Sequence, residues 1–237
     1  MIDFQPAPGH LPEGERVYAI GDIHGCADRL WALHEAIAED FARRPVESAL
    51  LLHIGDYVDR GPDSAGVVAR LVSGDLVPGV RTVNLMGNHE RTMIDALEGA
   101  GASATDWMIS GGREALASWG GDPDAPRPSW PACVPAAHMD FLRGLALSHQ
   151  VGGYLFVHAG IRPGVAIGEQ TAQDMLTIRN SFLYSESAFG AVVVHGHTPR
   201  GAPELRRNRI GIDTGAVFGG KLTCAVLEAD RVGFIQM

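Results

Sequence analysis

One short stretch of this sequence constrains the fold more than any other. An apolar run at residues 49–54 leads directly into a polar, glycine-bounded loop at residues 55–61. The run has the length and composition of a buried strand, and ligands of open α/β sheets bind at the carboxyl ends of such strands. The loop supplies the carboxylates of Asp56 and Asp59 and the planar guanidinium of Arg60, which suits a phosphate. Taken alone, the stretch is equally typical of a solvated loop.

A second apolar run, residues 17–20, leads into a similar turn. Asp22 and His24 follow it two positions apart, so their side chains share one face on an extended exit. A carboxylate and an imidazole in this arrangement have the spacing of metal ligands. Residues 26–42 carry apolar side chains at helical spacing, which predicts an amphipathic helix packed on a sheet. We expect His34 to lie at the surface or boundary of that helix.

Three further apolar runs end in residues of the same kind. The run at 81–86 is followed by Asn88 and His89, and the run at 154–157 is followed by His158. The run at 191–194 is followed by His195 and His197. Other strands are expected at 147–151, 209–212, 222–228 and 232–236, and other helices at 64–73 (capped by Asp63), 90–98, 136–145 and 171–178.

Every one of these five runs ends in a carboxylate, an amide or an imidazole, which surface polarity alone does not explain. The carboxyl ends of neighbouring strands meet at one edge of a sheet, so we expect a shared metal centre there. This donor set suits manganese, iron or zinc. It exceeds what one tetrahedral zinc requires, so two ions are expected, an arrangement that can hold the oxygens of a phosphoryl displacement.

The overall composition argues against several classes of protein. The formal net charge of −9 disfavours a nucleic-acid backbone as the main partner. The three cysteines are scattered, which favours a reducing compartment without a disulfide framework. No apolar run has the length of a membrane span, and the first residues lack the pattern of a signal peptide. We therefore expect a cytoplasmic protein with no nucleic-acid or membrane partner.

Three motifs occur in order: Gly-Asp-x-His-Gly at 21–25, Gly-Asp-x-Val-Asp-Arg-Gly at 55–61 and Gly-Asn-His-Glu at 87–90. They resemble the signature of the metallophosphoesterase superfamily in its phosphoprotein phosphatase branch. The segments at 196–199 and 212–218 resemble the small bacterial and phage members of that branch. The resemblance covers residues 17 to about 227. It implies the calcineurin-like fold, a four-layer α/β/β/α sandwich of two mixed sheets with a dinuclear centre between them.

The resemblance also implies a role for each matching residue. The metal ligands would be Asp22, His24 and Asp56 for one ion, and the shared Asp56 with Asn88, His158 and His197 for the other. Manganese is our first choice, with iron or zinc as alternatives. A hydroxide that bridges the two ions would attack phosphorus in line.

The remaining matches concern the leaving group and the phosphate. His89 matches the general acid, and Asp59 would orient it and raise its pKa. Arg60 and Arg179, together with Asn88, would bind the phosphate, although Arg179 stands in a weaker motif.

Three polar residues near the motifs receive no chemical role. We expect His195 to pack beside the ligands, His53 to be a hydrogen-bonded core histidine, and Glu90 to support the loop through hydrogen bonds.

The function implied is that of a phosphoprotein phosphatase for phosphoserine and phosphothreonine, with phosphotyrosine as a further substrate. The alternative is a hydrolase of dinucleoside polyphosphates of the diadenosine tetraphosphate type, which shares these motifs. An inactive scaffold with the same fold is disfavoured, because the whole motif set is present.

Residues 99–135 differ in composition from the rest of the chain. They contain Trp107, Trp119 and Trp130, many glycines and prolines, and a predicted helix that breaks at 111–112. The segment is too short to hold a core of its own, so we expect one domain over residues 1–237 with this segment as a cap insertion. We expect the cap to select substrates and not to be needed for hydrolysis of a minimal one.

Overall fold

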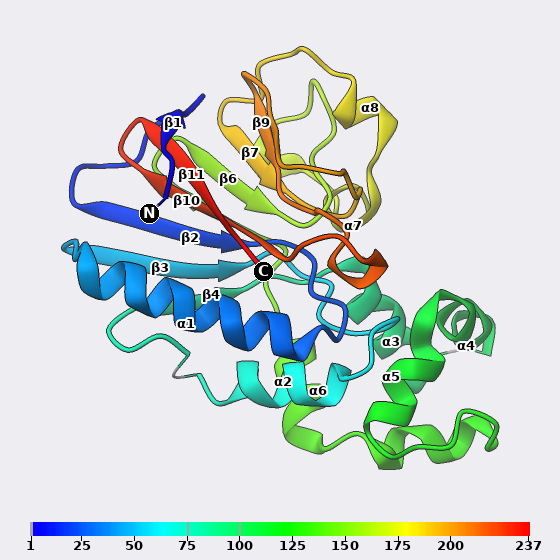
Figure 1. Ribbon diagram of the computed structural model, residues 1–237. Coiled ribbons are helices and arrows are strands. Elements are labelled where there is room, and N and C mark those ends of the chain that lie inside the picture. The colour runs from blue at the N-terminus through cyan, green and yellow to red at the C-terminus, as the bar shows by residue number, and fades with distance from the viewer. Residues whose placement is uncertain (1, 75, 100) are drawn as a thin grey trace.

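The computed structural model describes residues 2–74, 76–99 and 101–237. Two β-sheets lie face to face, and helices cover their outer faces (Figure 1). This confirms the predicted four-layer α/β/β/α sandwich of two mixed sheets. None of the described helices has both the length and the apolar character needed to cross a membrane.

The first sheet brings three strand ends to one edge. Strands β2, β3 and β4 run parallel, and their register aligns Ile20, His53 and Asn84. The polar residues that follow these strands therefore leave the sheet together. In spatial order the sheet contains β1 (Gln5–Pro6), β11 (Arg231–Gln236), β10 (Thr223–Glu228), β2 (Glu15–Ile20), β3 (Ser48–His53) and β4 (Arg81–Asn84).

The second sheet repeats this arrangement. Strands β6, β7 and β9 run parallel, so their carboxyl ends also share one edge. In spatial order the sheet contains β5 (Ser148–Val151), β6 (Tyr154–Val157), β7 (Val192–His195), β9 (Arg209–Gly211) and β8 (Glu204–Leu205).

Alternating side chains give each sheet two apolar faces. Leu50 and Leu52 of β3 meet Tyr154 and Phe156 of β6 in the core between the sheets. The residue between the first two, Leu51, points to the other face and packs with the helices there. This double burial fixes how the two sets of strand ends face each other.

The helices lie on the outer faces (Figure 1). On the side of the first sheet are α1 (Ala27–Arg43), α2 (Ser64–Val72), α3 (Asn88–Glu98) and α6 (Ala136–Arg143). On the side of the second are α7 (Ala172–Thr177) and α8 (Asn180–Leu183), with the short turn η3 (Ile167–Glu169) beside them. The short turn η4 (Ala216–Phe218) follows β9, and its Ala216 belongs to the core of the first side. As predicted, Asp63 caps α2, where its Oδ1 accepts the Gly66 N–H at 2.8 Å.

The 99–135 segment packs beside α3 at one end of the molecule (Figure 1). Gly111, with a φ of 112°, interrupts its helices and confirms the predicted break. Trp107 and Trp130 are buried in the same core as α1 to α3, so the segment contributes to the core on the helix side of the first sheet. Its elements are α4 (Gly101–Trp107), η1 (Met108–Gly112), α5 (Arg113–Ser118) and η2 (Arg127–Cys133).

The expectation for His34 is wrong. Its side chain is buried, and its Nε2 lies 3.0 Å from Nε2 of His53. His53 is the hydrogen-bonded core histidine that the sequence predicts, with Nδ1 2.8 Å from Oδ1 of Asn84. The apolar periodicity of α1 does not reveal that His53, on the sheet, offers His34 a hydrogen-bond partner. For that reason the sequence pattern does not predict the burial of His34.

Candidate metal centre and phosphate cavity

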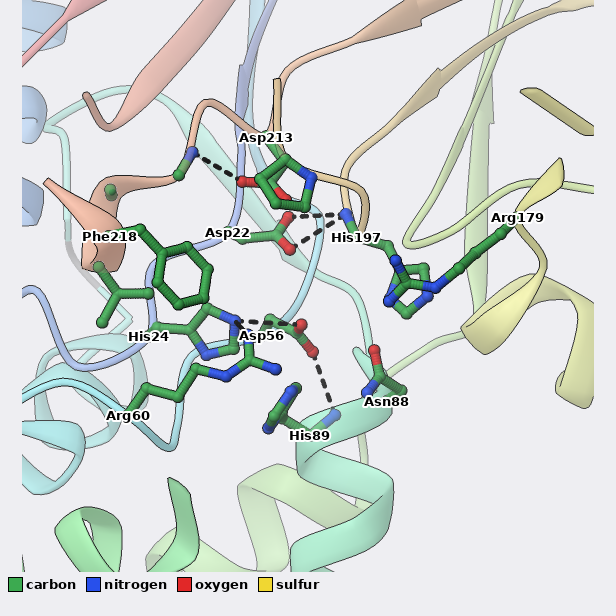
Figure 2. A pocket seen from close by; sticks show the side chains of 14 residues that line it. Asp22, His24, Asp56, Arg60, Asn88, His89, Arg179, His197, Asp213 and Phe218 are labelled. Carbon is green, nitrogen blue, oxygen red and sulfur yellow. Dashed lines mark hydrogen bonds and ion pairs between the residues drawn. The ribbon is translucent and has the colours of Figure 1, made fainter. Parts of the chain in front are cut away.

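The two sets of strand ends meet at one cavity of about 220 Å³. Figure 2 shows side chains approaching it from both sheets. The carboxylate oxygens of Asp22, after β2, lie 3.0 and 3.2 Å from the backbone N–H of His197, after β7, which they accept. The predicted residues that line the cavity are Asp22, His24, Asp56, Arg60, Asn88, His89, Arg179 and His197.

Asp56 stands between two groups of possible ligands. Its Oδ2 lies 3.4 Å from Nε2 of His24, and its Oδ1 lies 3.4 Å from Nε2 of His158. His197 joins the second group, within 4.8 Å of Asp56 and His158. The two groups therefore lie against different oxygens of one buried carboxylate.

Backbone carbonyls set the direction of two imidazoles. Nδ1 of His24 donates to the carbonyl of Val58 at 2.8 Å, and Nδ1 of His158 donates to that of Ile54 at 3.1 Å. A carbonyl only accepts, so each ring keeps the lone pair on Nε2. His158 Nε2 lies 2.9 Å from Oδ1 of Asn88, and the buried Nε2 of His197 has no hydrogen-bond partner among the described residues.

The charges of the site suit divalent cations. Burial lowers the pKa of His24 to about 4 and that of His197 to about 3, so both rings are neutral near pH 7, the form that binds metals. Burial, with Asp213 and Asp56, raises the pKa of Asp22 well above its usual range. Clustered buried carboxylates and neutral imidazoles are a donor set that a cation stabilises. The residues present therefore fit a metal centre.

The Asp59–His89 pair borders this centre. Nδ1 of His89 lies 2.7 Å from Oδ2 of Asp59, and both side chains are buried. Burial alone would lower the pKa of His89, but Asp56 and Asp59 outweigh it and raise that pKa. The possible ligand atoms of His89, His24 and Asp56 lie within 4.8 Å of one another. His89 therefore occupies a place in the group in which the resemblance implies Asp22.

Two arginines face the cavity from different elements. Nη1 of Arg60 donates to Nε2 of His24 at 2.8 Å, and the Arg60 guanidinium lies 5.5 Å from the ring centre of Phe218. Arg179 precedes α8 and approaches from the side of His197 (Figure 2). The cavity therefore has cationic groups on both sides.

Glu90 holds the loop that carries Asp56. Its buried carboxylate accepts the backbone N–H groups of Asp56, Tyr57 and Val58 at 2.9, 2.7 and 3.2 Å, and that of Gly87 at 2.8 Å. This is the supporting role that the sequence analysis expects for Glu90.

Backbone strain is concentrated at the site. Among the described residues, six that are not glycine have a positive φ, and five of these belong to the predicted site. They are His24, Asp56, Asp59, Arg60 and His197.

Six residues outside the predicted site also line the cavity: Pro199, Asp213, Gly215, Ala216, Val217 and Phe218. Asp213 lines it, and burial raises the pKa of its carboxyl group to about 6. It follows β9 as the other polar residues follow their strands, so the same rule would have found it. Phe218, on η4, is 65% exposed at the rim, and it lies in the 212–218 segment of the resemblance, which assigned it no role. His195 does not line the cavity and instead packs against Phe182, with ring centres 5.0 Å apart.

Known proteins match this chain over most of its length. A serine/threonine-protein phosphatase 1 of Salmonella typhimurium is 30% identical over 226 residues, which cover 90% of this chain and 92% of that protein. A bis(5'-nucleosyl)-tetraphosphatase PrpE of Bacillus subtilis is 30% identical over 224 residues, which cover 86% and 87%.

Solved structures share the fold. A structure described as a candidate diadenosine tetraphosphatase has a TM-score of 0.64 and 22% identity, with 93% of each chain covered. A cold-active protein-tyrosine phosphatase of a Shewanella species has a TM-score of 0.58 and 17% identity, over 94% of this chain and 80% of that one.

The model of the calcineurin-like phosphoesterase family matches residues 15–235, nearly the whole chain. That range contains every residue found at the cavity. The chain therefore belongs to the calcineurin-like phosphoesterase family, whose members are metal-dependent hydrolases of phosphate esters.

Proposed function

We propose that this protein is a phosphoprotein phosphatase that hydrolyses phosphoserine and phosphothreonine. One observation carries the proposal. The Asp59–His89 pair and Arg60 lie beside the two groups of possible metal ligands that Asp56 joins. The cavity of about 220 Å³ is smaller than the roughly 300–1,000 Å³ typical of pockets for drug-sized ligands. It suits a single phosphoryl group whose stem extends outward, as on a protein surface.

We assign the residues to two ions as the resemblance implies. When bound, the ions would lower the pKa of a shared water and neutralise charge on the phosphoryl oxygens. Arg60 contacts the Nε2 of His24 that a metal would take, so metal binding frees the guanidinium for the phosphate. The ligand sets are Asp22, His24 and Asp56 for one ion, and Asp56, Asn88, His158 and His197 for the other.

His89 supplies the proton for the leaving oxygen. Its Nδ1 is engaged with Asp59, which leaves Nε2 for the substrate, and the nearby carboxylates stabilise the protonated ring. Manganese is the metal we favour, with iron or zinc as alternatives.

The first prediction concerns Asp56. Asp56→Asn keeps the shape of the side chain but removes the charge that both ligand groups share, so we expect reduced occupancy of both metal sites by elemental analysis. The control is Asp95→Asn, which changes a half-exposed carboxylate paired with Arg91 on α3. Full occupancy with normal turnover in Asp56→Asn would remove Asp56 as the shared ligand.

The second prediction concerns His89. His89→Asn should keep its metals but lose turnover by about 10²–10⁴-fold on alkyl phosphates, the usual contribution of a general acid. The loss should be smaller for aryl phosphates, because their leaving groups need little protonation. His149→Asn, on β5 and outside the cavity, is the matched control. An equal loss on both ester types would argue against proton donation by His89.

A second candidate function, hydrolysis of dinucleoside polyphosphates, is favoured by a groove beside the cavity. The groove has a volume of about 540 Å³, and Arg60 and Phe218 line both it and the cavity. Ile109, which is 80% exposed, lines the groove as well. Such a surface could stack a nucleobase, and the B. subtilis relative is named a tetraphosphatase.

A direct comparison of substrates tests the choice. With added manganese, we expect kcat/KM for phosphoserine and phosphothreonine peptides to exceed that for diadenosine tetraphosphate by at least about tenfold, a difference of about 1.4 kcal/mol in transition-state binding. A reversed order would establish the second candidate. Absence of turnover on every phosphate ester by metal-loaded protein would favour the inactive scaffold.

We also propose that the cap selects substrates through the rim of this groove. The cap also carries two arginines that could contact a substrate, but both already have partners. Arg113 pairs with Asp124 at 2.8 Å, and Arg127 donates to the backbone carbonyl of Ala96 at 2.9 Å. Ile109, which is 80% exposed, is therefore the more accessible contact. Ile109→Ser should change the ratio of peptide to para-nitrophenyl phosphate turnover by several-fold, by loss of apolar contact. Tyr184→Ser changes an equally exposed side chain outside this groove and is the control. An unchanged ratio in Ile109→Ser would contradict substrate selection by the cap at this rim.

A further inference from the structure

The cap reaches the catalytic pair through a single tryptophan. Nε1 of Trp107 lies 2.8 Å from Oδ1 of Asp59, and the other oxygen of Asp59 lies 2.7 Å from Nδ1 of His89. Trp107 and Asp59 are fully buried, and His89 is only 3% exposed. The three side chains form one continuous chain of hydrogen bonds from α4 to the cavity.

The indole is rigidly placed. Its ring packs against Trp130, with ring centres 6.0 Å apart, and a side chain at Gly112 would overlap it. The neighbouring Gly111 carbonyl accepts the backbone N–H of Arg60 at 3.1 Å. The cap is therefore tied to two successive residues of the catalytic loop, Asp59 and Arg60. The indole has little freedom to move without moving that loop.

The chemistry of the groups fixes their roles. An indole N–H is a donor only, so Oδ1 of Asp59 must accept, and any proton that Asp59 shares lies on the His89 side. With Oδ1 held by Trp107, the carboxylate plane cannot turn, and Oδ2 stays directed at His89. A buried carboxylate that lost this donor would rotate to find another, and the imidazole would turn with it.

We propose that Trp107 is a positioning residue for proton transfer, which acts by orienting Asp59 and, through it, His89. The inference rests on the proposed role of His89 as general acid. It makes the cap part of the catalytic machinery and not only a substrate-selecting insertion. Trp107 does not line the cavity and does not belong to the ligand groups of Asp56, so its removal should affect proton donation and leave metal content intact.

The test is Trp107→Phe, which removes the N–H and keeps an aromatic ring. We expect kcat on alkyl phosphates to fall about tenfold or more, the usual effect of losing a hydrogen bond to a charged group. The loss on para-nitrophenyl phosphate should be markedly smaller, with KM and metal content nearly unchanged. Trp119→Phe is the matched control, because Nε1 of Trp119, in the same segment, donates to Nδ1 of His138 at 3.0 Å and not to Asp59.

A double-mutant cycle separates positioning from packing. In an Asp59→Ala background, Trp107→Phe should cause no further loss of kcat on alkyl phosphates, since its effect passes through Asp59. Additive losses, or equal losses on alkyl and aryl esters, would show that Trp107 only stabilises the core. Wild-type protein that hydrolyses no phosphomonoester would refute the proposed function itself, a result distinct from an unaffected Trp107→Phe variant.

If Trp107→Phe does not fold, an isostere keeps the inference testable. Benzothienylalanine at position 107 retains the shape of indole but replaces the N–H by sulfur. The same selective loss on alkyl phosphates is expected. Full activity of this folded variant would overturn the proposal.

Discussion

The site depends on one buried carboxyl group that does not itself line the cavity. Glu90 accepts four backbone N–H groups, three of them from the loop that begins at Asp56. A typical hydrogen bond in a protein contributes roughly 0.5–1.5 kcal/mol, so four of them together constrain this loop strongly. This set holds Asp56 at a φ of 53°, which a residue other than glycine rarely adopts. These bonds fix the loop from which the Asp56 carboxylate points between the two sheets.

Held in this way, Asp56 joins the two halves of the sandwich. His24, from the first sheet, faces its Oδ2, and His158, from the second, faces its Oδ1. The hydrogen bond from the backbone N–H of His197 to the Asp22 carboxylate also joins strand ends of the two sheets. A cation at each oxygen would therefore stabilise the packing of the two sheets as well as the chemistry, since it would bridge strand ends of both.

Much of this could be predicted from the sequence, because apolar strands followed by metal-type residues mark both the sheets and their functional edge. That rule gives the polar strand ends at the cavity, while the four-layer fold and Arg179 come from the resemblance. Applied to β9, the rule also gives Asp213. Contacts that depend on tertiary packing could not be predicted. The burial of His34 against His53 and the bond from Trp107 to Asp59 join residues 19 and 48 positions apart, and no local pattern encodes either contact.

The central claim is that Asp56 is shared by two ions. The most direct test is a crystal structure of manganese-loaded protein with anomalous scattering measured at the metal edge. We expect two anomalous peaks per chain, one beside each carboxylate oxygen of Asp56, with His24 at the first and His158 at the second. A single peak, or two peaks that do not share Asp56, would contradict it.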